Sequence, residues 1–484
     1  MLSRAQMAAS SVAEASPHLR GMAWWRSIGS PRFVCAPMVD ASELPFRLLT
    51  REFGATLCYT PMLHSRLLVE QPGYAQEHFS TSAEDRPLIA QLCGHDPSVV
   101  LAAALVLQDR GVDAVDLNLG CPQNIAKRGR YGAFLLEESE VVLSIVRALA
   151  RGLRIPVTVK MRLLASGDVD ATVAFARALE EAGASLLTLH GRTRHSMKQS
   201  ISSTDWDAIA RVKRALTIPV IANGSIACLD DVDACFAVTG ADAVMSSEAL
   251  LENPALFARG GIAVRGPLSG AGAKAADVFS LARRYLALTR ETNFSHMGII
   301  KGHMFKMLFG ALRAFPEHMD TLASSLTKTT EDIEAVVERT AAAVDATYAE
   351  RLWEGGASGP RAVYTADARA RIDAASGMRA AAVSSDVRCA WVNEPAFLID
   401  PSAPGAWYHR HRPDAFGGAK PPAGVRAATL KRARERALVE AEGGIVAAQT
   451  SEQISGALEM ALEAEGGIAA VQTSESEQTP GVLQ

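Results

Sequence analysis

The sequence predicts an α/β fold, a closed (β/α)8 TIM barrel followed by a small all-helical domain, and three observations support it. Eight short apolar runs recur between residues 33 and 248, and each stops at a polar residue or a turn. Segments with helical spacing separate these runs, as expected for parallel strands buried on both faces. No GxGxxG motif follows the first run, which favours a closed barrel over the alternative of a doubly wound sheet.

The predicted strands follow one another in a regular order along the chain. They begin at residues 33, 57, 88, 114, 157, 186, 220 and 243, with the sequences FVCAPM, LCYTPM, LIAQLCG, AVDLNLGC, VTVKMR, LLTLHGR, VIANGS and AVMSSE. Segments such as VDATVAFARALEEAGA have the spacing of connecting helices. We therefore assign residues 31–262 to a barrel domain. Residues 275–350 have the spacing of several helices, and we assign them to a separate helical domain.

Both ends of the chain have the composition of disordered segments. The Ser- and Ala-rich residues 1–30 are expected to be a disordered leader, with a transit peptide as the alternative. Residues 351–436 carry 14 basic and 8 acidic side chains, which predicts a basic, irregular extension. Residues 437–484 carry 8 acidic and no basic side chains and repeat the sequence EAEGGI, which predicts an acidic disordered tail. The net charge of −4 thus conceals a basic segment suited to a polyanion.

The composition restricts the class of protein. A chain with 48% hydrophobic and 21% charged residues can bury a large core. Because no apolar run reaches the roughly 18 residues that a membrane span needs, we expect no membrane partner. Seven scattered cysteines without a CxxC pair indicate neither a zinc site nor a disulfide framework. We expect a monomer in a reducing compartment, the cytoplasm, with the nucleus or an organelle as alternatives.

Polar side chains stand at the carboxyl ends of several predicted strands, where barrel enzymes build their active sites. Five residues share this position: Gln91, Asn118, Lys160, His190 and Asn223. Each one alone has an ordinary explanation, such as a solvated strand end or a core histidine. Their recurrence around one rim favours an active site.

Two groups of these residues suggest what the site binds. Lys160 and Arg162 point the same way along one strand, and His190 with Arg192 extends a cationic lining suited to an anionic flavin or a substrate carbonyl. The loops after the seventh and eighth predicted strands are a common phosphate site in barrels. The small or polar residues of these loops are Asn223, Gly224, Ser225, Ser247 and Glu248. An ordinary turn with a capping serine remains the alternative.

A single cysteine, Cys121, follows the fourth predicted strand and precedes the basic sequence KRGR. A thiol with the usual pKa of about 8.5 is protonated at neutral pH and can donate a proton. A thiolate next to a base would instead be a nucleophile. A third possibility is a small loop residue without a chemical role, and position alone leaves the three open.

The motifs taken together resemble those of the tRNA-dihydrouridine synthases. The sequences that carry the resemblance are APMVDASELPFRLLTREFGATLCYTPMLHS, RPLIAQLCGHDP, VDAVDLNLGCPQNIAKRGRYGAFLLEE, VTVKMRL, LHGRTR and PVIANGSI. They occur in order within residues 31–348. The sequences GCPQNIAKRGRYGAFL and ADAVMSSEALLENPALF are similar to those of the eukaryotic branch that acts on D-loop uridines, expected here to be positions 16 and 17.

The resemblance implies an FMN enzyme that reduces the C5=C6 bond of uridine in tRNA with NADPH or NADH. It implies that Cys121 is the general acid, protonating C5 after a hydride from FMN reaches C6. Asn118, Arg162 and Arg192 would face the substrate. The residues implied to bind the cofactor are Pro37, Met38, Val39, Gln91, Lys160, His190, Asn223, Gly224, Ser225, Ser247 and Glu248. No metal is implied.

Some features of the chain depart from this pattern or lie beyond it. Ser247 and Glu248 stand where many bacterial members have Gly-Arg, so the role of Glu248 is the least secure of the implied ones. The sequence WYHRHRP at residue 407 combines aromatic and basic side chains suited to RNA. Two alternative functions are an FMN-barrel reductase of a free pyrimidine and a catalytically inactive tRNA-binding homologue.

Overall fold

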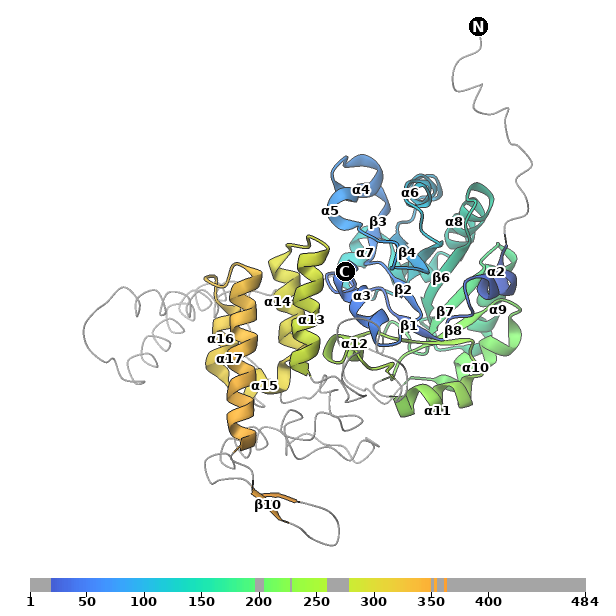
Figure 1. Ribbon diagram of the computed structural model, residues 1–484. Coiled ribbons are helices and arrows are strands. Elements are labelled where there is room, and N and C mark those ends of the chain that lie inside the picture. The colour runs from blue at the N-terminus through green and yellow to red at the C-terminus, as the bar shows by residue number, and fades with distance from the viewer. Residues whose placement is uncertain are drawn as a thin grey trace, which may run out of the picture. The chain divides into compact units, whose positions relative to one another are not determined.

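Eight parallel strands form the closed barrel that the sequence predicts (Figure 1). The computed structural model describes residues 19–195, 204–226, 229–258, 278–349, 352–354 and 361–363. Hydrogen-bonded neighbours run β1-β2-β4-β5-β6-β7-β8-β9 and return to β1. The barrel strands are β1 (Phe33–Cys35), β2 (Leu57–Tyr59), β4 (Leu88–Cys93), β5 (Ala114–Leu119), β6 (Val157–Arg162), β7 (Leu186–His190), β8 (Val220–Asn223) and β9 (Ala243–Ser246). All eight predicted strands are confirmed, and a short β3 (Leu63–His64) is added beside β4.

Helices connect the strands and continue beyond the barrel. Those between residues 44 and 252 are α3 (Leu44–Glu52), α4 (Ser65–Glu70), α5 (Tyr74–His78), α6 (Pro97–Asp109), α7 (Asn124–Gly129), the 3-10 helix η1 (Gly132–Glu137), α8 (Ser139–Gly152), α9 (Val169–Glu181), α10 (Trp206–Ala215), α11 (Leu229–Thr239) and α12 (Glu248–Glu252). Beyond them lie α13 (Val278–Glu291), α14 (Met297–Met307), α15 (Phe309–Ala314), α16 (Pro316–Ala323) and α17 (Thr330–Ala349). Aspartates begin three of the connecting helices: the carboxylates of Asp96, Asp168 and Asp205 accept first-turn backbone N–H groups.

Side chains alternate along each strand between the barrel interior and the surrounding helices. Val115 and Leu187 point outward into the large core that strands and helices share. The interior holds a second apolar cluster: Val34, Leu57, Tyr59, Ile89, Ala114, Leu186, Ile221, Ala243 and Met245. Because both faces are buried, the runs are mostly apolar. Polar residues on the interior face are concentrated toward the carboxyl ends of the strands, and they form the site described below.

The amino-terminal end of the barrel is closed by a helix that the sequence analysis missed. Residues Gly21–Ser27 form α2, in which Trp24 and Trp25 are buried against the interior cluster. The prediction of a disordered leader extending to residue 30 is therefore wrong for this stretch. Two tryptophans that bury their rings against apolar strand starts stabilise a helix that composition alone did not indicate. Residues 1–18 lie outside the described part of the chain.

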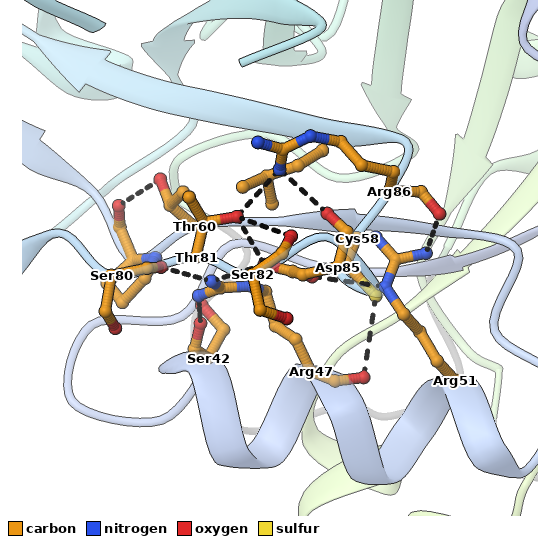
Figure 2. Close-up of polar contacts among 12 residues, drawn as sticks. Ser42, Arg47, Arg51, Cys58, Thr60, Ser80, Thr81, Ser82, Asp85 and Arg86 are labelled. Atoms are coloured by element: carbon orange, nitrogen blue, oxygen red, sulfur yellow. Dashed lines mark hydrogen bonds and ion pairs between the residues drawn. The ribbon is translucent and has the colours of Figure 1, made fainter. Parts of the chain in front are cut away.

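A buried ion-pair cluster fastens helix α3 to the segment before β4 (Figure 2). The Asp85 carboxylate accepts from Arg47 Nε at 3.0 Å and Nη2 at 2.7 Å, and from Arg51 Nε at 3.1 Å. Arg47 also donates to the carbonyls of Ser42 and Ser80, each at 2.7 Å. Arg47 and Asp85 are almost fully buried, so each charge depends on its partner.

The same helix connects the barrel to the helices after residue 278. Glu43, immediately before α3, is buried and accepts from Tyr285 Oη at 2.7 Å; His303 Nε2 lies 3.1 Å from the same carboxylate. Burial alone would raise the pKa of Glu43, but His303 and these hydrogen bonds hold it below its usual value. At the other end of α3, Glu52 accepts from Arg284 at 2.6 Å. The carboxylates of Glu43, just before α3, and of Glu52, its last residue, therefore bind groups from α13 and α14.

After residue 349, the structure describes only two short strands. β10 (Leu352–Glu354) and β11 (Arg361–Val363) pair antiparallel, so the expectation of irregular structure is wrong at these six positions. The WYHRHRP sequence and the acidic tail lie outside the described residues. Among the helices described, none is long and apolar enough to span a membrane.

The substitution Asp85→Asn tests the ion-pair cluster. It leaves the buried Arg47 guanidinium without its countercharge, and we expect the free energy of unfolding to fall by about 3 kcal/mol. Urea denaturation followed by tryptophan fluorescence measures this. Glu70→Gln, which removes one partner of the exposed Arg66–Glu70 pair, is the control and should leave the midpoint unchanged. Equal midpoints for both variants would contradict the assigned role.

Candidate active site

A cavity of about 180 Å³ opens among the carboxyl ends of the barrel strands. The residues that line it are Pro37, Val39, Met62, Gln91, Asn118, Gly120, Cys121 and Lys160. They come from β4, β5 and β6 and from the loops after β1, β2 and β5. Six residues predicted to belong to the site therefore meet around one cavity. Met62 and Gly120 were not among the predicted residues, because neither has a side chain that suggests chemistry.

Hydrogen bonds connect the polar residues of this cavity in a line. Asp116, in the middle of β5, accepts from Gln91 Nε2 at 2.8 Å and from Thr158 Oγ1 at 2.6 Å. Gln91 Oε1 accepts from Asn118 Nδ2 at 2.7 Å. Asn118 Oδ1 in turn accepts from the backbone N–H of Gly120 at 3.0 Å and of Cys121 at 3.1 Å. The rotamers of both amide side chains are thereby fixed.

The backbone around Cys121 is held from several directions. Arg162 Nε donates to the Gly120 carbonyl at 2.8 Å, and the N–H of Ala133 donates to the Cys121 carbonyl at 3.0 Å. Gly132 adopts a φ of +67°, and a Cβ there would lie 2.6 Å from the Cys121 carbonyl oxygen. Glycine is therefore required for the close packing of η1 against the cysteine loop. The half-buried thiol is held at the edge of the cavity.

Buried charges of both signs surround the cavity. Burial lowers the pKa of Lys160 to about 8, and the neighbouring Arg162 contributes in the same direction. Burial also lowers the pKa of Arg162 to about 10 and raises the pKa of Asp116 to about 6. At pH 7 all three groups are charged, because the pKa values of Lys160 and Arg162 lie above 7 and that of Asp116 lies below it. The site thus combines two cations with one deeply buried anion.

His190, at the end of β7, is a neutral imidazole in this environment. Burial, followed by the charges of Arg162 and Lys160, holds its pKa well below the usual value. Its Nε2 atom is buried and has no hydrogen-bond partner among the described residues. A buried polar atom without a partner normally indicates a missing ligand or water. His190 can therefore accept from or donate to a group bound at the strand ends.

The loop after β8 packs beside His190. Asn223 pairs with His190 in the sheet register, and its Nδ2 donates to the Met245 carbonyl at 3.0 Å. Gly224 has a φ of +114°, and a Cβ there would lie 2.9 Å from the His190 ring. The Ser225 hydroxyl receives a hydrogen bond from Arg192 at 3.2 Å. The structure therefore brings these predicted residues together next to the cavity, outside the set that lines it.

The remaining predicted residues lie at other positions near the rim. The Met38 side chain packs against the apolar clusters, and its backbone bonds to Ser42. Ser247 precedes α12, and Glu248 is its first residue; both are half-buried. None of the three lines the cavity.

Asp116 is the site residue that sequence reasoning missed. It lies within the apolar run AVDLNLGC, and an ionisable residue inside a fully buried strand is unusual. Its spacing of two from Asn118 places it on the same interior face. These two signals together could have identified it.

Comparison with known proteins identifies the family of this chain. The dihydrouridine synthase (Dus) family model matches residues 34–346, which is more than half of the chain. The chain belongs to the dihydrouridine synthase family. The matched region contains the barrel strands, β1 from Val34 onward, and most of the helices after residue 278.

Curated relatives in this family include eukaryotic proteins. A tRNA-dihydrouridine(16/17) synthase-like protein of Rattus norvegicus, whose name specifies NAD(P)(+), is 43% identical over 323 residues, 66% of this chain and 69% of its own length. The tRNA-dihydrouridine(16/17) synthase of Schizosaccharomyces pombe is 40% identical over 321 residues, 65% of this chain and 78% of its own. A 20a/20b synthase-like protein of Mus musculus is 37% identical over 215 residues, 44% of this chain and 64% of its own.

The substitution Gly132→Ala tests the packing around the cysteine in this dihydrouridine synthase. The added Cβ meets the Cys121 carbonyl and disfavours the positive φ, so the cysteine loop must move. A displacement of about 1 Å at a reacting group reduces turnover roughly 100-fold. Gly167→Ala, at a positive φ with open space around it, is the matched control for backbone strain. Comparable activity of the two variants, measured as product per enzyme, would contradict the role of the contact.

Proposed function

We propose that this protein is a tRNA-dihydrouridine synthase that reduces the C5=C6 bond of D-loop uridines. The observation that carries the proposal is the Cys121 thiol, held at the edge of a cavity that Gln91, Asn118 and Lys160 also line. A proton donor, oriented amides and a buried cation around one cavity suit the reduction of a conjugated carbonyl compound. Membership of the family supports the same reaction.

The target positions are proposed to be uridines 16 and 17. The relatives named for these positions match about 320 residues of this chain, whereas the 20a/20b relative matches 215. The longer alignment is 40–43% identical. The greater extent and identity favour the 16/17 assignment.

FMN is proposed as the bound cofactor, reduced by NADPH or NADH. Lys160 and Arg162 provide positive charge, and His190 provides a buried ring nitrogen without a partner among the described residues. These groups suit a flavin ring that carries carbonyl oxygens and becomes anionic on reduction. The cofactor would supply a hydride for C6 of uracil. The proposed binding residues are Pro37, Met38, Val39, Gln91, Lys160, His190, Asn223, Gly224, Ser225, Ser247 and Glu248.

The protein's part in the reaction is to orient the uracil and deliver a proton. When a hydride adds to C6, negative charge develops on C5 and the C4 carbonyl of uracil. The Cys121 thiol donates its proton to C5, which completes dihydrouridine and leaves a thiolate to be reprotonated from solvent. Arg162 and Arg192 contribute positive charge near the substrate, and Asn118 faces it with a fixed rotamer.

The rim of the cavity has features suited to a base flipped out of the RNA stack, as this chemistry requires. The side chains of Val39 and Ile125 are 58% and 64% exposed despite being apolar. Lys127 and Arg128 lie in the last turn of α7, which follows Cys121. Arg130 is tied to Glu138 at 2.7 Å. In α7, Ile125 therefore offers an apolar contact for a base close to Lys127 and Arg128, which can bind phosphates.

The decisive experiment is a reduction assay with purified protein, NADPH and unmodified tRNA, with dihydrouridine mapped by mass spectrometry. We expect bound flavin and new dihydrouridine at positions 16 and 17. Flavin with reduction of free uridine instead would favour the pyrimidine reductase. Binding of tRNA without product would favour the inactive homologue.

Replacement of the thiol separates chemistry from binding. Cys121→Ala should keep its FMN and reduce dihydrouridine formation at least about 100-fold, because general acid catalysis is typically worth that much. The control is Cys235→Ala, which removes another buried thiol far along the chain and should leave turnover unchanged. Full activity of Cys121→Ala would remove the thiol from the mechanism.

The charge of Lys160 should make FMN affinity depend on pH. Its pKa of about 8 lies below the ordinary 10.5, so the charge is present at pH 7 and lost by pH 9. The Kd for FMN, measured by fluorescence titration of flavin-free protein, should rise up to about tenfold between these values. Lys160→Met should bind weakly at both, whereas the exposed Lys328→Met should behave like the wild type. A wild-type Kd that does not change with pH would contradict the role.

A further inference from the structure

The hydrogen bonds that lead from Asp116 to Cys121 all run in one direction. An ionised carboxylate can only accept hydrogen bonds, and Asp116 accepts from Gln91 Nε2. The opposite end of that amide, Oε1, must then accept, and Asn118 Nδ2 donates to it. The oxygen of Asn118 is left to accept from two backbone N–H groups, Gly120 and Cys121.

Each step of this chain excludes the reverse orientation. If Gln91 turned over, its oxygen would face the Asp116 carboxylate and its nitrogen would face Asn118 Nδ2, so both contacts would be lost. If Asn118 turned over, its nitrogen would meet the N–H groups of the cysteine loop. The Asp116 carboxylate and the backbone N–H groups of Gly120 and Cys121 therefore require the same orientation of the two amide side chains.

We propose that Asp116 is a positioning residue whose carboxylate fixes the rotamers of Gln91 and Asn118 and thereby the backbone that carries the Cys121 thiol. The inference rests on the proposed function, in which this thiol donates the proton to C5. A proton donor must lie within hydrogen-bond reach of the atom that it protonates. A chain of defined direction fixes the cysteine loop relative to the barrel without contacting the substrate.

The burial of Asp116 supports a functional role over a stabilising one. The carboxylate has no exposed surface, lies in the barrel interior and has its pKa raised to about 6 by burial. A carboxyl group with a raised pKa favours folding in its protonated form, and this contribution is lost as the pH rises through about 6. At pH 7.5 the ionised group opposes folding, so Asp116→Asn should leave Tm equal or higher.

The test is a double-mutant cycle between the two ends of the chain. Asn118→Asp keeps an oxygen for the backbone N–H groups but presents a second oxygen to Gln91, so two carboxylates compete for one Nε2. We expect turnover to fall about 30-fold, with the KM for tRNA changed less than about twofold. Asp116→Asn alone allows either direction, so a fraction of the molecules carries a displaced cysteine loop and turnover should fall about threefold.

The double variant Asp116→Asn/Asn118→Asp should recover at least about tenfold over Asn118→Asp alone. Gln91 can then turn over, donating to the carboxylate at position 118 and accepting from the amide at position 116. The Tm of the flavin-loaded proteins should show the same recovery. A double variant no more active than Asn118→Asp, or losses that simply multiply, would overturn the proposal.

The double variant could also recover because it relieves repulsion between two carboxylates. This alternative is tested by repeating the cycle in a Gln91→Met background and measuring Tm. The recovery should vanish there, because no amide remains to turn over; a recovery of the same size would overturn the proposal. Wild-type protein assayed in parallel distinguishes failure of the positioning proposal from failure of the proposed function. If it forms no dihydrouridine, the function is wrong, whereas the Tm cycle still tests the chain.

Discussion

Closure of eight parallel strands into a barrel gives every strand side chain one of two positions, inside the barrel or against the helices. The positions of the core and of the site both follow from this alternation. Residues at even spacing share a face, so Asp116 and Asn118 both point inward, as do Lys160 and Arg162 on the next strand. Apolar residues fill the interior near the strand starts. The polar ones are thus brought together at one end, although they are far apart in sequence.

Helix α3 has a comparable importance for the parts outside the barrel. One side of it carries Arg47 and Arg51, which bind the Asp85 carboxylate and hold the segment before β4. Glu43, which precedes it, and Glu52, its last residue, bind groups from α13 and α14. Each of these contacts joins residues that only the folded chain brings together. Local helix propensity therefore accounts for little of its position.

The sequence was sufficient to predict the barrel because burial on both faces leaves continuous apolar runs with polar ends. For the same reason Gln91, Asn118, Cys121 and Lys160 could be assigned to one site before their contacts were known. Other features depend on tertiary contacts that leave no periodic pattern. Helix α2 is stabilised by Trp24 and Trp25 against strand starts as distant in sequence as Ala243. Asp116 was hidden inside an apolar run, and its significance comes from partners on two other strands.

The contact at Glu43 has a mechanical consequence for the cavity. Val39, on the cavity wall, precedes Glu43 by only four residues, and the intervening turn is tightened by hydrogen bonds between Met38 and Ser42 at 3.0 and 3.1 Å. A connection this short, held by these hydrogen bonds, leaves Val39 and Glu43 little freedom to move independently. Because Tyr285 of α13 and His303 of α14 both contact the Glu43 carboxylate, a substitution in either helix that displaces Glu43 should also displace Val39 at the cavity wall.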